Sequence, residues 1–342
     1  MPRVEGAALA LAAVPTAHEP EQLSLFGGGI DLMALRRERA SIAESRLSPA
    51  TREAYRWDWA DFTRWCDCAG RVLLPASSDT VQLYAVYLAG LQRSPNTIER
   101  RCAAIAQRHL AAGFKSPVDE DVREVLAGIR RRLGACARHA KAALSVPELR
   151  KLLAAAGQGR GAAPARDRAV LLLGFASGCR RLELANLDLA DVELLEAGVI
   201  LHLRRSKTDQ EGRGREVAVH RGECAATCPV EALEAWLRLR GPAAGPLFCR
   251  LHSRSGAVVP PGLRMSGEAV ARIVQECAGR AGLDRCRYGG HSLRAGLATA
   301  AAESGASELA IMRRTGHRSV DMVQRYVRHG TLFAVNPLAG LL

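Results

Sequence analysis

Bulky side chains recur at three- and four-residue intervals early in the chain, at Tyr55, Trp59, Phe62 and Trp65. This spacing places them on one face of a helix, and such a face must pack against other elements to leave water. Similar helical patterns follow over 78–92, 95–112 and 119–133, with Pro or Gly in the loops between them. We therefore predict a compact bundle of about four or five helices in this part of the chain.

The second half of the chain mixes helical patterns with a short strand pair. Ser145 is a good helix N-cap, followed by Pro147 and Glu148, so a new domain begins near residue 145. Residues 198–204 alternate as a strand, residues 215–220 are expected to pair with it, and 205–214 form the hairpin loop. Further helices are predicted over 166–178, 229–239, 266–282, 292–304, 307–315 and 319–326.

The length of 342 residues fits two domains at roughly 150 residues each. We predict a mainly α protein: a flexible N-terminal arm (1–45), a helical domain (46–135), a linker (136–145), a mostly helical domain with a small antiparallel β-sheet (146–330), and a C-terminal tail (331–342). The arm is assigned from its Ala-, Gly- and Pro-rich composition.

Charge and hydropathy restrict the classes of function. The chain carries 48 Lys and Arg against 35 Asp and Glu, a net charge of +13, which favours a polyanionic partner such as nucleic acid. No apolar run is long enough to span a membrane, and the N-terminus does not resemble a secretion signal. We therefore expect a cytoplasmic protein with no membrane association, whose ten cysteines stay reduced.

Four motifs in the second half are weak individually. Arg180 and Glu183 are three residues apart and are expected to form a solvated ion pair. His291 and Arg294 are predicted to lie on one side of a helix. His317 follows a glycine that is expected to end a helix. Tyr326 lies on an amphipathic pattern, where a tyrosine usually packs in the core. Their order along a basic two-domain chain, with Lys207 on the hairpin between the first two motifs, is much more informative.

With this ordered set the sequence resembles the tyrosine recombinase (phage integrase) family over residues 48–327. The resemblance implies an N-terminal core-binding (SAM-like) domain and a C-terminal catalytic domain that close around duplex DNA as a clamp. It implies a site-specific DNA recombinase that cleaves and rejoins strands through a 3′-phosphotyrosine and a Holliday junction. A bacterial, phage or plasmid origin and association with the nucleoid are implied as well.

The residue types fit this chemistry. Arg180, Arg294 and His317 can donate to the phosphate oxygens that gain charge during attack. By the resemblance, Tyr326 is the nucleophile and His291 its base. Lys207 can protonate the departing 5′-oxygen, whereas an arginine could not usefully give up a proton. Glu183 is expected to orient Arg180, and no metal, ATP or other cofactor is implied.

The resemblance also predicts the partners. Protomers would bind inverted-repeat sites on double-stranded DNA and assemble as a homotetramer in the synaptic complex, with the apolar tail 331–342 docked on a neighbouring subunit. Arg181, Arg205 and Arg272 are the predicted DNA contacts. Two alternatives stay open: strand relaxation like that of a type IB topoisomerase, and a non-catalytic DNA-binding accessory protein. A zinc site at His220, Cys224 and Cys228 is disfavoured because no fourth ligand is near.

Overall fold

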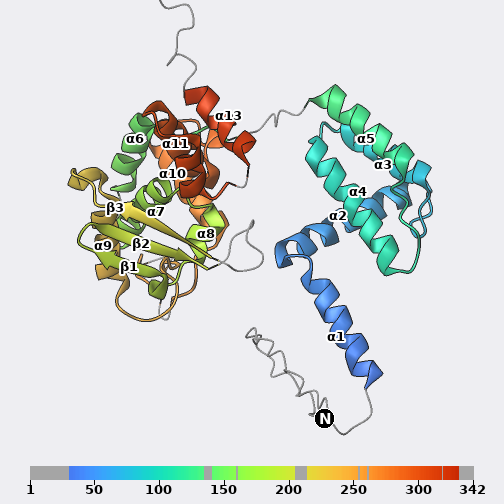
Figure 1. Ribbon diagram of the computed structural model, residues 1–342, viewed down its shortest axis with the longest axis horizontal. Helices are drawn as coiled ribbons and strands as arrows, with labels where there is room; N and C mark the ends of the chain where they lie inside the picture. Colours follow the sequence, from blue (N-terminus) through green and yellow to red (C-terminus); the bar gives the residue numbers. More distant parts are fainter. Residues whose placement is uncertain are drawn as a thin grey trace, which may run out of the picture. The chain divides into compact units, whose positions relative to one another are not determined.

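The computed structural model describes residues 31–134, 141–158, 161–204, 214–252, 255–259, 262–317 and 319–330. The chain divides into two compact units, Met1–Cys136 and Ala137–Leu342 (Figure 1). The prediction of a mainly α fold with a small antiparallel sheet is confirmed. Within the described residues, no helix has both the length and the apolar character needed to cross a bilayer.

The first unit is helical throughout its described part. Its helices are α1 (Leu32–Ser45), α2 (Pro49–Ala69), α3 (Ser78–Gly90), α4 (Pro95–Ala111) and α5 (Glu120–Leu133). The N-cap side chains of Ser48, Ser77, Ser94 and Asp119 accept a backbone N–H of the helix that each begins, which explains where α2 to α5 start. The predicted bundle is confirmed, and Phe62 of α2 lies fully buried at its centre.

The last third of the predicted arm differs from expectation, because Leu32–Ser45 forms helix α1. Asp31 caps this helix by accepting the backbone N–H groups of Met33 and Ala34, at 2.8 and 3.0 Å. The segment is rich in Ala, Leu, Arg and Glu, which have high helix propensity, so a helix forms here without an apolar repeat. Residues 1–30 lie outside the described part.

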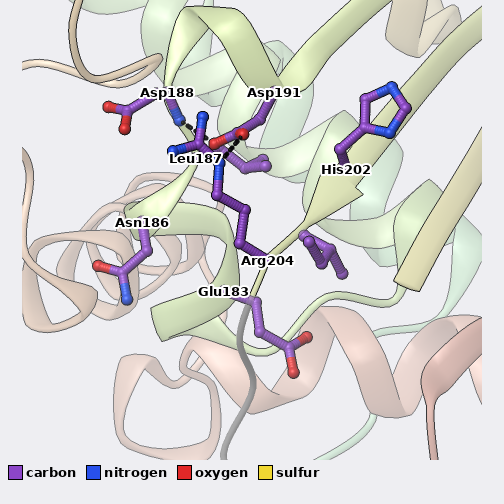
Figure 2. A pocket seen from close by; sticks show the side chains of 8 residues that line it. Glu183, Asn186, Leu187, Asp188, Asp191, His202 and Arg204 are labelled. Atoms are coloured by element: carbon purple, nitrogen blue, oxygen red, sulfur yellow. Dashed lines mark hydrogen bonds and ion pairs between the residues drawn. The ribbon is translucent and has the colours of Figure 1, made fainter. Parts of the chain in front are cut away.

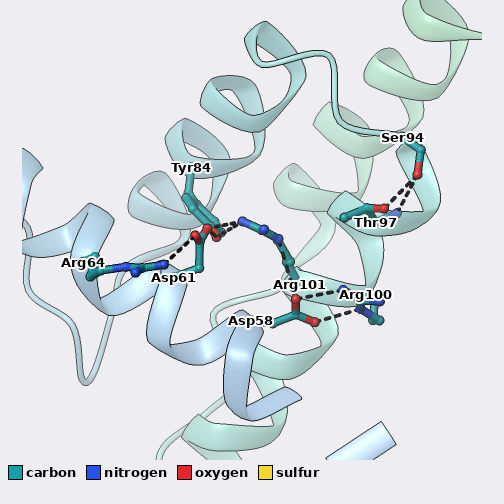
Figure 3. A network of polar contacts seen from close by, with 8 residues as sticks. All are labelled: Asp58, Asp61, Arg64, Tyr84, Ser94, Thr97, Arg100 and Arg101. Atoms are coloured by element: carbon teal, nitrogen blue, oxygen red, sulfur yellow. Dashed lines mark hydrogen bonds and ion pairs between the residues drawn. The ribbon is translucent and has the colours of Figure 1, made fainter. Parts of the chain in front are cut away.

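A polar network ties α2, α3 and α4 together inside the first unit (Figure 3). Asp58 is buried and accepts two hydrogen bonds from Arg100, at 2.8 and 2.9 Å. Asp61 accepts from the Tyr84 hydroxyl at 2.8 Å and also pairs with Arg101. The network links the three helices through the buried Asp58 and the largely buried Arg101.

The second unit places one small sheet beside a group of helices. The sheet is antiparallel in the order β1 (Val192–Leu195), β2 (Gly198–Leu203) and β3 (Arg215–His220). The predicted pairing of the last two strands is confirmed, with Val199 opposite Val219. The sequence did not reveal β1, because most of its residues are exposed and show no alternation. Helices α7 (Ala163–Ser177) and α9 (Pro229–Arg240) both contact β3.

The remaining helices of this unit are α6 (Val146–Ala156), α8 (Arg181–Asn186), α10 (Gly267–Arg280), α11 (Gly290–Glu303), α12 (Glu308–Thr315) and α13 (Val320–Gly330). Helix α7 packs against α6, α9 and α11, and its side chains from Ala169 to Leu173 are buried. Short 3-10 turns lie at Leu189–Asp191, Ala225–Thr227 and Arg285–Arg287.

The second half of the predicted linker is attached to this unit. The backbone N–H groups of Ala142 and Leu144 donate to Arg287 and Ser292, at 2.8 and 3.1 Å, and the Leu144 side chain is fully buried. An apolar leucine and paired backbone groups stabilise this stretch although it is neither helix nor strand. Residues 135–140 lie outside the described part of the chain.

Candidate active site

The corner between α7 and α8 positions Arg180. Gly178 ends α7 in the left-handed region at φ +63°, and a Cβ there would lie 2.6 Å from a methyl group of Leu297. Only glycine meets both requirements, so the chain can turn sharply at this point. Arg180 then becomes the N-cap residue of α8, with its side chain four-fifths buried.

Glu183 holds the Arg180 side chain in place. Its carboxylate is almost fully buried and accepts the Arg180 backbone N–H at 2.8 Å and the Arg180 Nη1 at 2.6 Å. A second guanidinium, that of Arg215, donates to the same carboxylate at 3.1 Å. Two cations around one buried carboxylate leave this region with a net positive charge, which suits an anionic ligand.

Arg294 lies one turn beyond His291 on α11 and is buried to 99%. Its Nη1 donates to the carbonyl oxygen of Gly178 at 2.9 Å and to that of Thr315. Its Nη2 is buried and has no hydrogen-bond partner among the described residues. Burial and the neighbouring charge of Arg180 lower the pKa of Arg294 to about 10, so the guanidinium is still charged at neutral pH.

The C-terminal end of α12 is contacted by three arginines. The carbonyl oxygens of Arg314, Thr315 and Gly316 accept hydrogen bonds from Arg215, Arg294 and Arg180, respectively. The last carbonyls of a helix lack helical partners and carry partial negative charge, so they attract cations. The helix end thus gathers three guanidinium groups that would otherwise repel one another.

His317 follows this helix end directly. Gly316 caps α12 at φ +66°, and its close approach to the Arg215 side chain leaves little room for a Cβ. The Nδ1 of His317 is 2.7 Å from the hydroxyl of Thr315, which is itself fully buried. Burial, followed by the positive charges of Arg294 and Arg180, lowers the pKa of His317 to about 4.

Tyr326 on α13 lies close to both histidines. Its hydroxyl is 2.8 Å from the Nε2 of His291, and its ring centroid is 5.9 Å from that of His317. Desolvation and the charges of Arg294 and Arg180 lower the pKa of His291 below 6.5. An unprotonated Nε2 at neutral pH can accept the phenolic proton.

The structure therefore brings together, in one unit, the predicted site residues Arg180, Glu183, His291, Arg294, His317 and Tyr326. Lys207 lies outside the described residues, as do Arg205 and the tail 331–342. Arg181 is exposed and pairs with Glu268 at 3.0 Å, and Arg272 is exposed on α10. No cluster of three or more potential metal ligands occurs within the described ranges.

Arg215 is a site residue that sequence reasoning missed. It starts β3, and strand alternation puts it on the same face as the buried residues Val217 and Val219. The available signal was an arginine at a strand position where the alternation of residues 215, 217 and 219 would lead one to expect an apolar side chain. Its Nε is buried and has no hydrogen-bond partner in the described part of the chain, so it holds a second unused donor beside that of Arg294.

A hollow of about 370 Å³ has Glu183 as one of its lining residues (Figure 2). Arg204, the last described residue before the hairpin loop, donates here to Asp191 at 2.6 Å. Asp188 at the same hollow pairs with Arg264 at 2.5 Å. Three carboxylates line the hollow, those of Glu183, Asp188 and Asp191, and each is paired with an arginine. The Arg204–Asp191 pair thus ties the end of β2 to the 3-10 turn before β1.

Comparison with known proteins identifies the family of the chain. Residues 143–331 match the model of the "Phage integrase family". The chain is 37% identical to an "Integrase/recombinase xerD homolog" of Selenomonas ruminantium, covering 90% of this chain and 89% of that protein. It is 25% identical to "Recombinase cre" of Escherichia phage P1, over 87% of this chain and 88% of that one.

A lambda integrase dimer bound to a COC′ core site has the same fold, with a TM-score of 0.57, 17% sequence identity, and coverage of 86% of this chain and 77% of that one. The family resemblance noted from the ordered motifs is confirmed. The chain belongs to the phage integrase family and is a site-specific DNA recombinase of the tyrosine type.

Proposed function

We propose that the protein cleaves and rejoins DNA strands through a 3′-phosphotyrosine formed on Tyr326, without metal or ATP. The observation that carries this proposal is the 2.8 Å contact between the Tyr326 hydroxyl and the His291 Nε2, beside the cluster of arginines. A phenol with a pKa near 10 is a poor nucleophile at neutral pH, and a neutral imidazole in contact with it removes its proton during attack.

The scissile phosphate binds where the arginines leave donors unused. The Arg294 Nη2 and the Arg215 Nε are buried without partners among the described residues, and a phosphate oxygen would satisfy such donors. Arg180 and His317 contribute further N–H groups to the same oxygens. These donors are held rigidly by Glu183 and the end of α12, so they can stabilise charge as it develops on phosphorus.

The step balances without a co-reactant. The Tyr326 oxygen forms a bond to phosphorus, the phosphorus–5′-oxygen bond breaks, and His291 takes the phenolic proton. Lys207, on the hairpin that begins after Arg204, protonates the 5′-oxygen. Because the new ester retains the phosphodiester energy, a 5′-hydroxyl from another duplex can reverse the step, exchange strands and form a Holliday junction.

We further propose that protomers bind inverted repeats on double-stranded DNA and act as a homotetramer, in which residues 331–342 dock on a neighbour. The relatives support this partner class: one matched structure is described as a dimer on a core site, and another, with a TM-score of 0.53, as a recombinase on a palindromic substrate. Arg181, Arg205 and Arg272 are proposed DNA contacts.

Covalent trapping tests the chemistry. Wild type and Tyr326→Phe are incubated with nicked DNA carrying candidate sites, in EDTA, and then denatured. We expect a protein–DNA adduct from the wild type alone, with a free 5′-hydroxyl on the released strand. An adduct formed by Tyr326→Phe would reject the nucleophile, and loss of the wild-type adduct in EDTA would reject metal independence.

A relaxation assay separates the alternatives. Relaxation of any supercoiled plasmid regardless of site would favour a type IB topoisomerase activity.

A binding site recovered by random selection tests the non-catalytic alternative. If the protein binds this DNA stably but forms no covalent adduct with it, the result would favour an accessory protein.

A further inference from the structure

Thr315 is the last residue of α12, and its hydroxyl contacts two groups inside the protein. Oγ1 lies 2.7 Å from the carbonyl oxygen of Ile311, which can only accept a hydrogen bond, so the hydroxyl donates its proton there. The same Oγ1 lies 2.7 Å from the Nδ1 of His317. The side chain is fully buried, so water does not compete for either contact.

A hydroxyl has one proton and two lone pairs, and this count decides the direction of the second hydrogen bond. Because the Thr315 hydroxyl donates its only proton to the Ile311 carbonyl oxygen, Oγ1 can only accept a hydrogen bond from the Nδ1 of His317. The imidazole therefore carries its hydrogen on Nδ1. A neutral ring has a single N–H, and its Nε2 then has a lone pair and no hydrogen. We infer that Thr315 is a positioning residue that fixes His317 in the Nδ1–H tautomer.

This inference rests on the proposed function and adds a requirement to it. A neutral His317 in the Nδ1–H tautomer cannot donate from Nε2 to a phosphate oxygen. The ring must take up a second proton when the phosphate arrives, and Thr315 then accepts from the Nδ1–H of the imidazolium. In the free protein, burial and the charges of Arg294 and Arg180 disfavour protonation of His317. A negatively charged phosphate offsets the charge of these arginines and so favours protonation.

Nitrogen NMR on the full-length, DNA-free protein tests the tautomer directly. Histidine labelled with ¹⁵N is incorporated, and the His317 signals are assigned by their loss in His317→Gln. Protonated and unprotonated ring nitrogens resonate far apart, so long-range ¹H–¹⁵N spectra identify which nitrogen carries hydrogen. We expect a hydrogen on Nδ1 and none on Nε2 near pH 7. A wild-type spectrum with the hydrogen on Nε2 overturns the inference.

Matched variants separate positioning from packing. Thr315→Val keeps the shape of the side chain and removes the hydroxyl, whereas Thr315→Ser keeps the hydroxyl. We expect His317 to lose its preference for the Nδ1–H tautomer in Thr315→Val, and adduct formation to slow by about tenfold or more. Thr315→Ser should restore both the tautomer and the rate. Thr299→Val, at a half-buried threonine farther along α11, serves as the control. An unchanged tautomer or an unchanged adduct rate in Thr315→Val contradicts the proposal.

The two proposals fail in different ways. A wild type that shows the Nδ1–H tautomer but never forms an adduct would reject the proposed function and leave the tautomer assignment intact. A wild type that forms the adduct with hydrogen on Nε2 would reject only the role of Thr315.

Discussion

The Nε2 of His291 and the hydroxyl of Tyr326 lie 2.8 Å apart although 35 residues separate them in the chain. His291 is in the first turn of α11 and Tyr326 is in the middle of α13, and these two helices pack against each other. The contact therefore depends on the packing of two helices within one unit.

The pH dependence of cleavage should report His291. Its pKa is lowered from the usual 6.5, first by desolvation and then by the charges of Arg294 and Arg180, so the neutral ring that can accept a proton predominates at neutral pH. We expect protonation of His291 to lower the adduct-forming rate in buffer more acidic than about pH 6.5, in addition to the pH dependence that proton uptake by His317 imposes. His291→Gln should be slower by about 10²–10⁴-fold and should lack this acidic decline. If the decline survives in His291→Gln, another group causes it.

Arg215 should matter for cleavage although it is not among the residues that the family motifs indicate. Arg215→Ala removes one partner of Glu183 and the hydrogen bond to the end of α12, so Arg180 and His317 lose support. We expect adduct formation to slow by about tenfold or more, as for other groups that orient a site residue. Arg221→Ala, which breaks an exposed pair with Glu234 just after β3, is the matched control. Equal rates in the two variants would show that Arg215 has no such role.

Gly178→Ala should destabilise the second unit strongly. An alanine there is strained by its positive φ and also collides with Leu297, whereas Gly282→Ala in the same unit has a positive φ of +75° and open space. We expect Gly282→Ala to cost about 1–2 kcal/mol of unfolding free energy and Gly178→Ala to cost about 1–3 kcal/mol more. Denaturant unfolding measures both. Leu297→Ala in the Gly178→Ala background should recover part of the difference, and no recovery would argue against the collision.

The Asp58 network should stabilise the first unit. Asp58 is buried, and replacing it with alanine leaves the largely buried Arg101 short of a counter-charge. We expect a loss of about 3 kcal/mol in the free energy of unfolding. Glu120→Ala breaks an exposed pair with Arg123 in the same unit and should cost at most about 1 kcal/mol. Comparable losses in the two variants would mean that burial of the network adds nothing.

The sequence alone was enough to predict most of the helices, because caps and apolar periodicity are local features. Ser94 marks the start of α4, and Gly178 marks the end of α7, without reference to any distant residue. The order of Arg180, His291, Arg294, His317 and Tyr326 along the chain is enough to indicate the family. Helix α1 and strand β1 were missed because α1 depends on propensity and an Asp31 cap, and β1 depends on pairing with β2.

Only the tertiary structure decided how the site is supported. In the sequence, Arg215 stands out only as an arginine at an apolar position of a strand, and Thr315 looks like any other helical residue. Their roles depend on hydrogen bonds to groups brought close by folding, the Glu183 carboxylate for one and the His317 ring for the other. Such contacts join β3 to α8 and the end of α12 to His317. The direction of a side-chain hydrogen bond depends on every neighbour it meets, and a linear sequence does not specify those neighbours.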